Sequence, residues 1–337
     1  MIKRIEGYDF IRSVAILIVF LGHILQIEDR DGNAWLVIHA LSLSSGMAMS
    51  LLGFISAVLL SDTEYDYGAF LVRRFTRIFI PLACCLSIML AAHALLGKKI
   101  VTTHVLFHYL GLSAFFDVFG ITNKATIGRG LWFITAIMIM YLIFPLLQKL
   151  FRHPRGFIHL TMIVIMCTAL NYFIYAQSSW NVFVSFSLGV YLSINGKISQ
   201  LIEKETIVPF IGAAGLIAIS ILIYYKIIPN EIKYFFYTFY PLFYVPILFM
   251  IAKRLPALLL AFSTFFASLS YEFYILHFYF INKEYQDIIN FSSSLYAKML
   301  ISFLTTLVLA CIVSKYASRL RKAANDYLLA VQCQENG

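Results

Sequence analysis

Long apolar runs separated by short polar connections make up most of the chain. A hydrocarbon core of about 30 Å requires about 17–25 consecutive apolar residues from a crossing helix. One run, 180–195, is short and fits a tilted or partly buried segment. The sequence predicts a single all-α membrane domain, a polytopic bundle of about ten transmembrane helices, from runs at 8–27, 35–60, 77–96, 130–150, 157–176, 180–195, 206–228, 233–252, 257–282 and 294–316.

Composition supports a membrane protein over a soluble one. Of the 337 residues, 61% are hydrophobic and 13% are charged, whereas a soluble domain is about 45–50% apolar and about 25% charged. The net charge of +9 suits anionic lipid headgroups or an anionic substrate, and nucleic acid is not expected because the basic residues are scattered among apolar runs. No metal site is expected, because the cysteines lack metal-ligand spacing: Cys84, Cys85, Cys167, Cys311 and Cys333.

The distribution of basic residues predicts an orientation. With the N-terminus on the cytoplasmic side, 16 of the 26 lysine and arginine residues fall at cytoplasmic ends of the runs, in agreement with the positive-inside rule. An even number of crossings returns the C-terminus to the same side. Both termini are therefore predicted to be cytoplasmic, and residues 317–337 form a basic tail that can lie along the anionic leaflet.

The first run, "YDFIRSVAILIVFLGH", carries Arg12 and His23 eleven residues apart. On an α-helix this spacing is an advance of about 16 Å and lies within about 20° of three full turns, so the two side chains face the same way at two depths. Ionisable groups in a span usually face the bundle interior or a wet cavity. We expect His23 to act as a general base on a hydroxyl; the alternative is a core histidine hydrogen-bonded to a neighbouring helix.

Two further groups of charged residues accompany Arg12. Asp9 lies three residues before it, and the simplest interpretation of Asp9 and Arg12 is an ion pair that anchors the helix, which does not exclude a ligand. "VRRFTRIFIP" places Arg74 and Arg77 on one helical face at the start of the third run. Guanidinium groups bind phosphates bidentately, so Arg12, Arg74 and Arg77 together suit a polyphosphate ligand on the cytoplasmic side. For Arg74 and Arg77, positive-inside anchoring alone is the alternative.

A late segment, "LSYEFYILHFYF", contains a glutamate and a histidine inside an apolar run. Tyr271, Tyr274 and His277 recur every three residues and share a helical face, which Glu272 flanks. We expect Glu272 and His277 to approach one cavity with His23, orienting it or holding the acceptor. An aromatic membrane-interface belt is the alternative for the tyrosines, although it does not account for Glu272 and His277.

Three other residues have simpler explanations than a role in chemistry. Trp132 in "GRGLWFITAIMIMYLIFP" is most simply an interface anchor, with substrate contact as the alternative. His104 and His108 have the spacing of two helical metal ligands, but no third ligand is evident. We therefore expect surface or packing roles for both histidines.

Together these segments resemble the acyltransferase-3 family of integral membrane O-acyltransferases, which modify bacterial surface polysaccharides and related glycans. The first-helix spacing is similar to the family's Asp, Arg and His signature, and "LWFITAIMIMYLIFP" is similar to its Leu-Trp-Phe segment. Two departures are Leu52, where the family usually has Ser before Gly53, and Gly130, where a polar group is frequent. The matching residues are Asp9, Arg12, His23, Arg74, Arg77, Pro81, Ser270, Tyr271, Tyr274 and His277.

The resemblance implies an activity, a location and substrates. It implies a multi-pass protein of the bacterial cytoplasmic (inner) membrane that uses an acyl-CoA donor, usually acetyl-CoA, and a sugar hydroxyl on a lipid-linked or polymeric glycan as acceptor. It also implies essential roles for Arg12 and His23. The rival interpretations are a transporter or flippase for a lipid-linked sugar and a non-catalytic assembly subunit. The acceptor sugar and the oligomeric state stay open, and an oligomer is compatible with the sequence.

Overall fold

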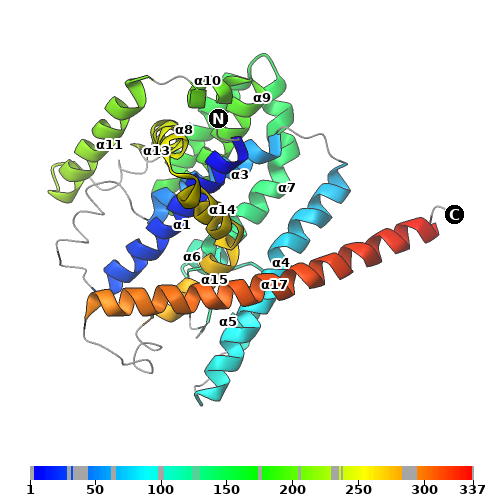
Figure 1. Ribbon diagram of the computed structural model, residues 1–337. Coiled ribbons are helices and arrows are strands. Elements are labelled where there is room, and N and C mark those ends of the chain that lie inside the picture. The colour runs from blue at the N-terminus through cyan, green and yellow to red at the C-terminus, as the bar shows by residue number, and fades with distance from the viewer. Residues whose placement is uncertain are drawn as a thin grey trace.

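The computed structural model describes residues 4–28, 32, 45–61, 66–97, 102–123, 125, 127–128, 130–173, 177–203, 206–228, 235–236, 238–282 and 294–335. All the regular elements in these ranges are helices, which confirms the predicted all-α class (Figure 1). They are α1 (Arg4–Glu28), α3 (Ser45–Ser61), α4 (Tyr67–Leu95), α5 (Thr102–Tyr109), α6 (Ala114–Val118), α7 (Trp132–Arg152), α8 (Gly156–Phe173), α9 (Gln177–Ile194), α10 (Lys197–Glu203), α11 (Val208–Tyr224), α13 (Tyr240–Arg254), α14 (Ala257–Ser268), α15 (Ser270–Ile281) and α17 (Leu295–Glu335).

Every predicted apolar run contains helix, but only some of these helices could each cross a membrane. Residues 35–44 of the second run, 174–176 of the fifth, and 233–234 and 237 of the eighth lie outside the described residues. Within the described part, α1, α4, α7 and α17 are long and apolar enough to span, and two bent helix pairs would raise the number from four to six. The chain is thus a multi-pass membrane protein, whereas ten crossings and cytoplasmic termini stay predictions.

The ninth run, predicted as one span over 257–282, is two helices that meet at an angle of 74°. The Ser268 hydroxyl donates to the Phe265 carbonyl at 2.6 Å. The backbone N–H of Leu269 turns instead to the Phe266 carbonyl at 3.0 Å. The regular backbone hydrogen bonding is thus interrupted at Leu269, between the end of α14 and the start of α15. The bend sends α15 in a new direction, against α1, α4 and α17.

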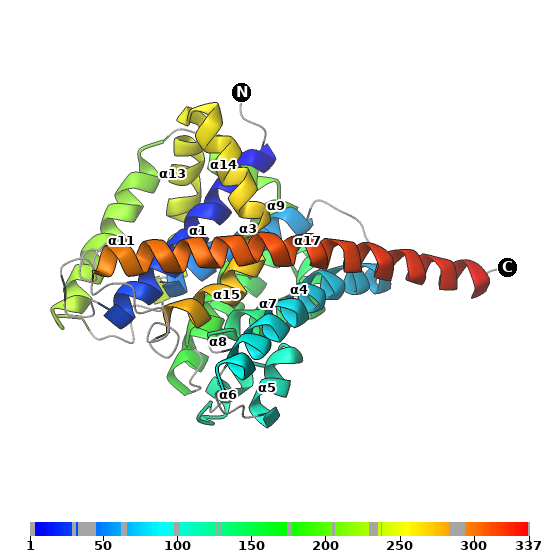
Figure 2. The same ribbon diagram turned by 60° about the horizontal axis from the view of Figure 1, so that its bottom comes forward.

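The last run extends further than predicted. The sequence placed the end of the final span at 316 and a separate tail at 317–337, whereas α17 continues as one helix to Glu335. Figures 1 and 2 show α17, coloured orange to red, crossing the bundle and projecting beyond the other helices at its C-terminal end. Its start is tied to the end of α1 by an ion pair, with Lys298 Nζ 2.6 Å from Glu28 Oε2.

Close helix packing surrounds α1. This helix contacts α3, α13, α14 and α15, and α3 packs in turn against α9. Glycines permit the α3–α9 approach: a Cβ added at Gly53 would lie 2.7 Å from Val182 Cγ1, and one at Gly189 would lie 2.7 Å from the Phe54 carbonyl oxygen. Small residues at membrane helix contacts allow backbones to come this close. The result is a rigid frame for the side chains that α1 carries.

His108 organises the segment between α4 and α7. Its Nε2 lies 3.3 Å from Asn123 Nδ2 and its Nδ1 lies 2.7 Å from Ser113 Oγ. The Ala125 N–H donates to Asn123 Oδ1 at 2.9 Å, which leaves the Asn123 NH2 group to donate to His108. His108 Nε2 is therefore an acceptor, and the proton of the neutral ring is on Nδ1. His104 stacks on the Phe116 ring, so both histidines take part in packing within this segment.

We predict that acidification loosens the α5–α6 region through His108. Burial lowers the pKa of His108 from its ordinary 6.5 to about 4. Between these two pH values the unfolded segment binds more protons than the folded one, so its stability falls as the pH decreases. Hydrogen–deuterium exchange of amides 110–121, normalised for intrinsic rates, should be faster at about pH 4.5 than at about pH 7.

His108→Gln supplies the control, because it removes the titrating ring and keeps His104 and Asp117. Exchange in this variant should show a much smaller pH dependence. An equal pH dependence in the variant and the wild type would assign the effect to the remaining groups and contradict the prediction.

Candidate active site

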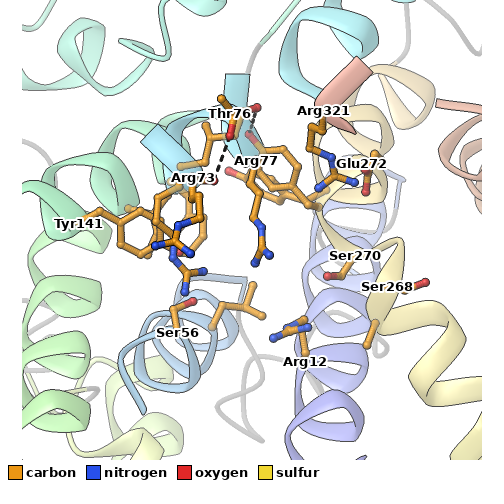
Figure 3. Close-up of a pocket in the computed structure, with 18 of the residues that line it drawn as sticks. Arg12, Ser56, Arg73, Thr76, Arg77, Tyr141, Ser268, Ser270, Glu272 and Arg321 are labelled. Carbon is orange, nitrogen blue, oxygen red and sulfur yellow. Dashed lines mark hydrogen bonds between the residues drawn. The ribbon is translucent and has the colours of Figure 1, made fainter. Parts of the chain in front are cut away.

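A cavity of about 770 Å³ opens where α1, α3, α4, α7, α14, α15 and α17 converge (Figure 3). Among the described residues that line it, six are basic and one, Glu272, is acidic. Such an excess of one charge in a cleft attracts ligands of the opposite sign, and arginine favours phosphate and carboxylate oxygens. The six basic residues are Arg12, Arg73, Arg74, Arg77, Arg321 and Lys322.

Three of these basic residues come from the first turns of α4. Asp66 caps this helix, its side chain accepting from the Ala69 N–H at 3.0 Å, and so determines where the helix begins. Arg73 Nε donates to the Ala69 carbonyl at 3.1 Å. The Arg74 guanidinium lies 5.7 Å from the Phe70 ring centroid and 5.6 Å from that of Tyr141, within cation–π distance. Local contacts therefore orient Arg73 and Arg74 before any ligand binds.

Arg12 lines the cavity from α1. Its Nη1 lies 3.2 Å from Asp9 Oδ1, and both side chains are partly exposed. The ion pair expected from the sequence is therefore present, with Arg12 on the cavity wall and Asp9 absent from the described lining. Because the pair is partly solvated, Arg12 keeps the capacity to bind an anion.

His23 and His277 form a hydrogen-bonded pair. His23 Nδ1 lies 2.9 Å from His277 Nε2, and the two rings are parallel, with centroids 5.2 Å apart. His277 Nδ1 lies 2.6 Å from the Tyr274 carbonyl oxygen, which can only accept, so this nitrogen carries a proton. In a neutral pair, His277 Nε2 then accepts from His23 Nδ1, and the lone pair of His23 is on Nε2. His277 thus fixes the tautomer of His23.

The histidine pair lies beyond the cavity rather than on its wall. Ile16 lines the cavity from α1, and His23 follows it by seven residues, an advance of about 10 Å. Tyr274 lines the cavity from α15, and His277 comes one turn later. Arg12 and His23 are therefore on the same helix as predicted, with only Arg12 among the residues described as lining the cavity.

The late segment divides its polar residues between two places. Glu272 is buried, 3% exposed, and lines the cavity; Ser314 gives it a hydrogen bond, and Arg321 interacts with it electrostatically. His277 points instead to His23. Glu272 and His277 are five residues apart on α15, so their side chains point in directions that differ by about 140° around the helix axis. The expectation that Glu272 and His277 share one cavity is therefore not met.

The remaining candidates hold the helices together. The Tyr271 hydroxyl donates to the Ile78 carbonyl at 3.0 Å, and the Tyr274 hydroxyl donates to the Gly130 carbonyl at 2.7 Å. These bonds tie α15 to α4 and to the start of α7. Trp132 packs edge-on against Phe133 and is not among the described lining residues. The described residues contain no group of three or more His, Cys, Asp or Glu side chains that could hold a metal ion.

Sequence reasoning missed the contribution of α17. Ser318, Arg321 and Lys322 line the cavity, although the sequence assigned them to a tail along the membrane. A signal was available, because "SKYASRLRKAANDY" contains neither glycine nor proline to end the helix before it.

Comparison with known proteins identifies the family of the chain. No curated protein and no solved structure matches the chain. A family model described as an acyltransferase domain, Acyl_transf_3, matches residues 5–315. This range contains four of the six basic residues on the cavity wall and both histidines of the pair, and it covers nearly the whole sequence. The chain therefore belongs to the acyltransferase-3 family and is a membrane acyltransferase.

Proposed function

We propose that the protein transfers an acetyl group from acetyl-CoA to a hydroxyl of a cell-surface glycan or its lipid-linked precursor. In this proposal it works in the bacterial cytoplasmic membrane. The observation that carries it is the pairing of an arginine-lined cavity with a histidine whose Nε2 is available as a base. A polyphosphate donor and a hydroxyl acceptor need these two features.

The donor is proposed to bind with its phosphates in the cavity. Phosphate groups cannot enter hydrocarbon unaccompanied, and guanidinium groups bind them with paired hydrogen bonds. The uncharged pantetheine arm is narrow and long. It extends along α1 from Arg12 towards His23, which are about 16 Å apart along the helix axis.

The acyl transfer itself is assigned to the histidine pair. His23 Nε2 removes the proton from the acceptor hydroxyl as the hydroxyl oxygen attacks the thioester carbonyl carbon. The carbon–sulfur bond then breaks, CoA leaves as a thiolate, and His23 returns the proton to that sulfur. His277 holds His23 in the tautomer that this step requires, through the 2.9 Å hydrogen bond.

A transporter for a lipid-linked sugar is the second candidate, and the two bent helix pairs favour it. α9 and α10 meet at 101°, and α14 and α15 meet at 74°; broken helices are common in transporters. The mass of the host's surface glycan with and without this protein distinguishes the two functions. Loss of acyl mass supports the acyltransferase, and loss of the whole glycan supports transport.

We predict that His23→Ala abolishes acylation without loss of inserted protein. General acid–base catalysis contributes about 10²–10⁴-fold, so activity should fall to about 1% of wild type or below. Release of free CoA thiol from acetyl-CoA by purified protein measures the rate. His153→Ala, at an exposed histidine between α7 and α8, is the matched control and should be silent. Residual activity above about a tenth of wild type would remove His23 from the role of base.

His277 should act through His23. His277→Gln keeps a side chain able to accept from His23 Nδ1, whereas His277→Phe does not. We expect a smaller loss of kcat for His277→Gln than for His277→Phe, with the KM for acetyl-CoA unchanged in both. Equal losses in the two variants, measured in the same assay, would contradict a role in holding the tautomer.

Arginine-to-lysine substitutions separate phosphate recognition from membrane anchoring. Arg74→Lys and Arg77→Lys keep the positive charge that sets orientation but lose the planar guanidinium. Both variants should insert normally and bind acetyl-CoA more weakly, by about tenfold, in equilibrium binding to purified protein. Arg155→Lys, exposed in the connection before α8, is the control. Unchanged affinity in both variants would mean that these arginines only anchor the helix.

A further inference from the structure

The C-terminal part of α17 forms a wall of the cavity although it lies outside the family match. The match ends at residue 315, and α17 continues without interruption to Glu335. Ser318, Arg321 and Lys322 all lie past 315, and all three line the cavity. Two of the six basic side chains around the site therefore come from beyond the matched range.

Helix register positions Arg321. Ala310, Val313 and Ala317 are buried, at 0–1% exposure, and recur every three to four residues along the face of α17 that packs on the bundle. Residues with this spacing lie on one face of a helix. Arg321 follows Ala317 by four residues and therefore lies on the same face. α17 packs against α15 and α4 along this face. The packing of α17 therefore directs Arg321 towards the cavity.

Arg321 already has an electrostatic partner inside the site. Glu272 is buried on α15, and Arg321 is a source of the favourable charge that it experiences. Figure 3 shows the Arg321 guanidinium beside the Glu272 carboxylate, while Arg73 lies near Tyr141 on the opposite side of the cavity. Glu272 thus places a negative charge beside Arg321 on the cavity wall. The basic residues fall into two groups, one on α1 and α4 and the other on α17.

The α17 group lies on the cavity, apart from the histidine pair. Arg321 and Lys322 line the cavity, whereas neither His23 nor His277 is among its described lining residues. A ligand whose reactive end lies near His23 would therefore meet Arg321 and Lys322 with a part other than its reactive end.

We propose that Arg321 and Lys322 bind the 3′-phosphate at the nucleotide end of the acyl-CoA donor. The inference rests on the proposed function, which supplies the donor. CoA carries two separate anionic groups, a diphosphate and a ribose phosphomonoester, and the cavity has two separate basic groups. The phosphomonoester lies furthest from the thioester and carries about −1.5 to −2 charges at neutral pH. A guanidinium with a neighbouring ammonium matches this group.

The test compares acetyl-CoA with 3′-dephospho-acetyl-CoA as donors for the purified full-length protein. For the wild type, removal of the 3′-phosphate should raise KM by about tenfold or more with little change in kcat. Arg321→Gln and Lys322→Gln should each raise KM for acetyl-CoA and leave KM for the dephosphorylated donor unchanged. The preference for the 3′-phosphate is the KM for the dephosphorylated donor divided by the KM for acetyl-CoA. In the double variant this ratio should fall towards one.

Three variants guard against structural effects. Arg319→Gln removes the same charge from an exposed position of the same helix that does not line the cavity, and it should keep the wild-type preference. Lys322 is also exposed, so Lys322→Gln tests the inference without disturbing the packing of α17. Arg321→Lys retains a positive charge beside Glu272 and should restore part of the preference.

The outcomes separate this inference from the proposed function. Transfer from both donors with equal KM in the wild type would overturn the inference and leave the acyltransferase proposal standing. Arg319→Gln should keep the wild-type preference for the 3′-phosphate. If Arg321→Gln and Lys322→Gln also keep it, the inference is overturned and the acyltransferase proposal is not. Absence of transfer from either donor, with correctly folded protein, would overturn both.

Discussion

The hydrogen bond between His23 and His277 joins the first and ninth apolar runs, and the site is built around it. For His277 to reach α1, α15 must leave the direction of α14, and the 74° bend at Leu269 makes this turn. The hydroxyls of Tyr271 and Tyr274 then fasten α15 to its neighbours. A polar contact inside an apolar bundle thereby determines the course of two helices, since each ring needs the other as a partner.

Charge imposes a second constraint on the same bundle. The cavity concentrates basic residues on α1, α4 and α17, close to where the apolar stretches of these helices begin or stop. Six basic residues face a single acidic residue among those described on the wall. So many like charges can lie within a membrane protein only where water or an anion can enter. The histidine pair occupies the apolar interior instead, as two rings that satisfy one another. Anion recognition and proton transfer are therefore kept apart along α1.

Local features of the site could be predicted from the sequence, and distant contacts could not. Arg12 and Asp9 are three residues apart, so helical spacing was sufficient to predict their ion pair, and Arg74 and Arg77 were placed together for the same reason. His23 and His277 are 254 positions apart. Their periodicity showed that each faces inward, but which side chains meet depends on the 74° bend between α14 and α15. Hydropathy is high on both sides of this bend and therefore does not reveal it.

The uninterrupted course of α17 has a consequence for how this chain can change in length. A helix turns by about 100° and advances about 1.5 Å with each residue. Deleting one residue between Ala310 and Ala317 would swing everything downstream by more than a quarter turn, so that Arg321 would leave Glu272 and a neighbour would take its place. Insertions in the loops carry no such penalty. Among related chains, the distance in residues from the membrane-embedded part of this helix to its arginine should therefore vary far less than loop length does.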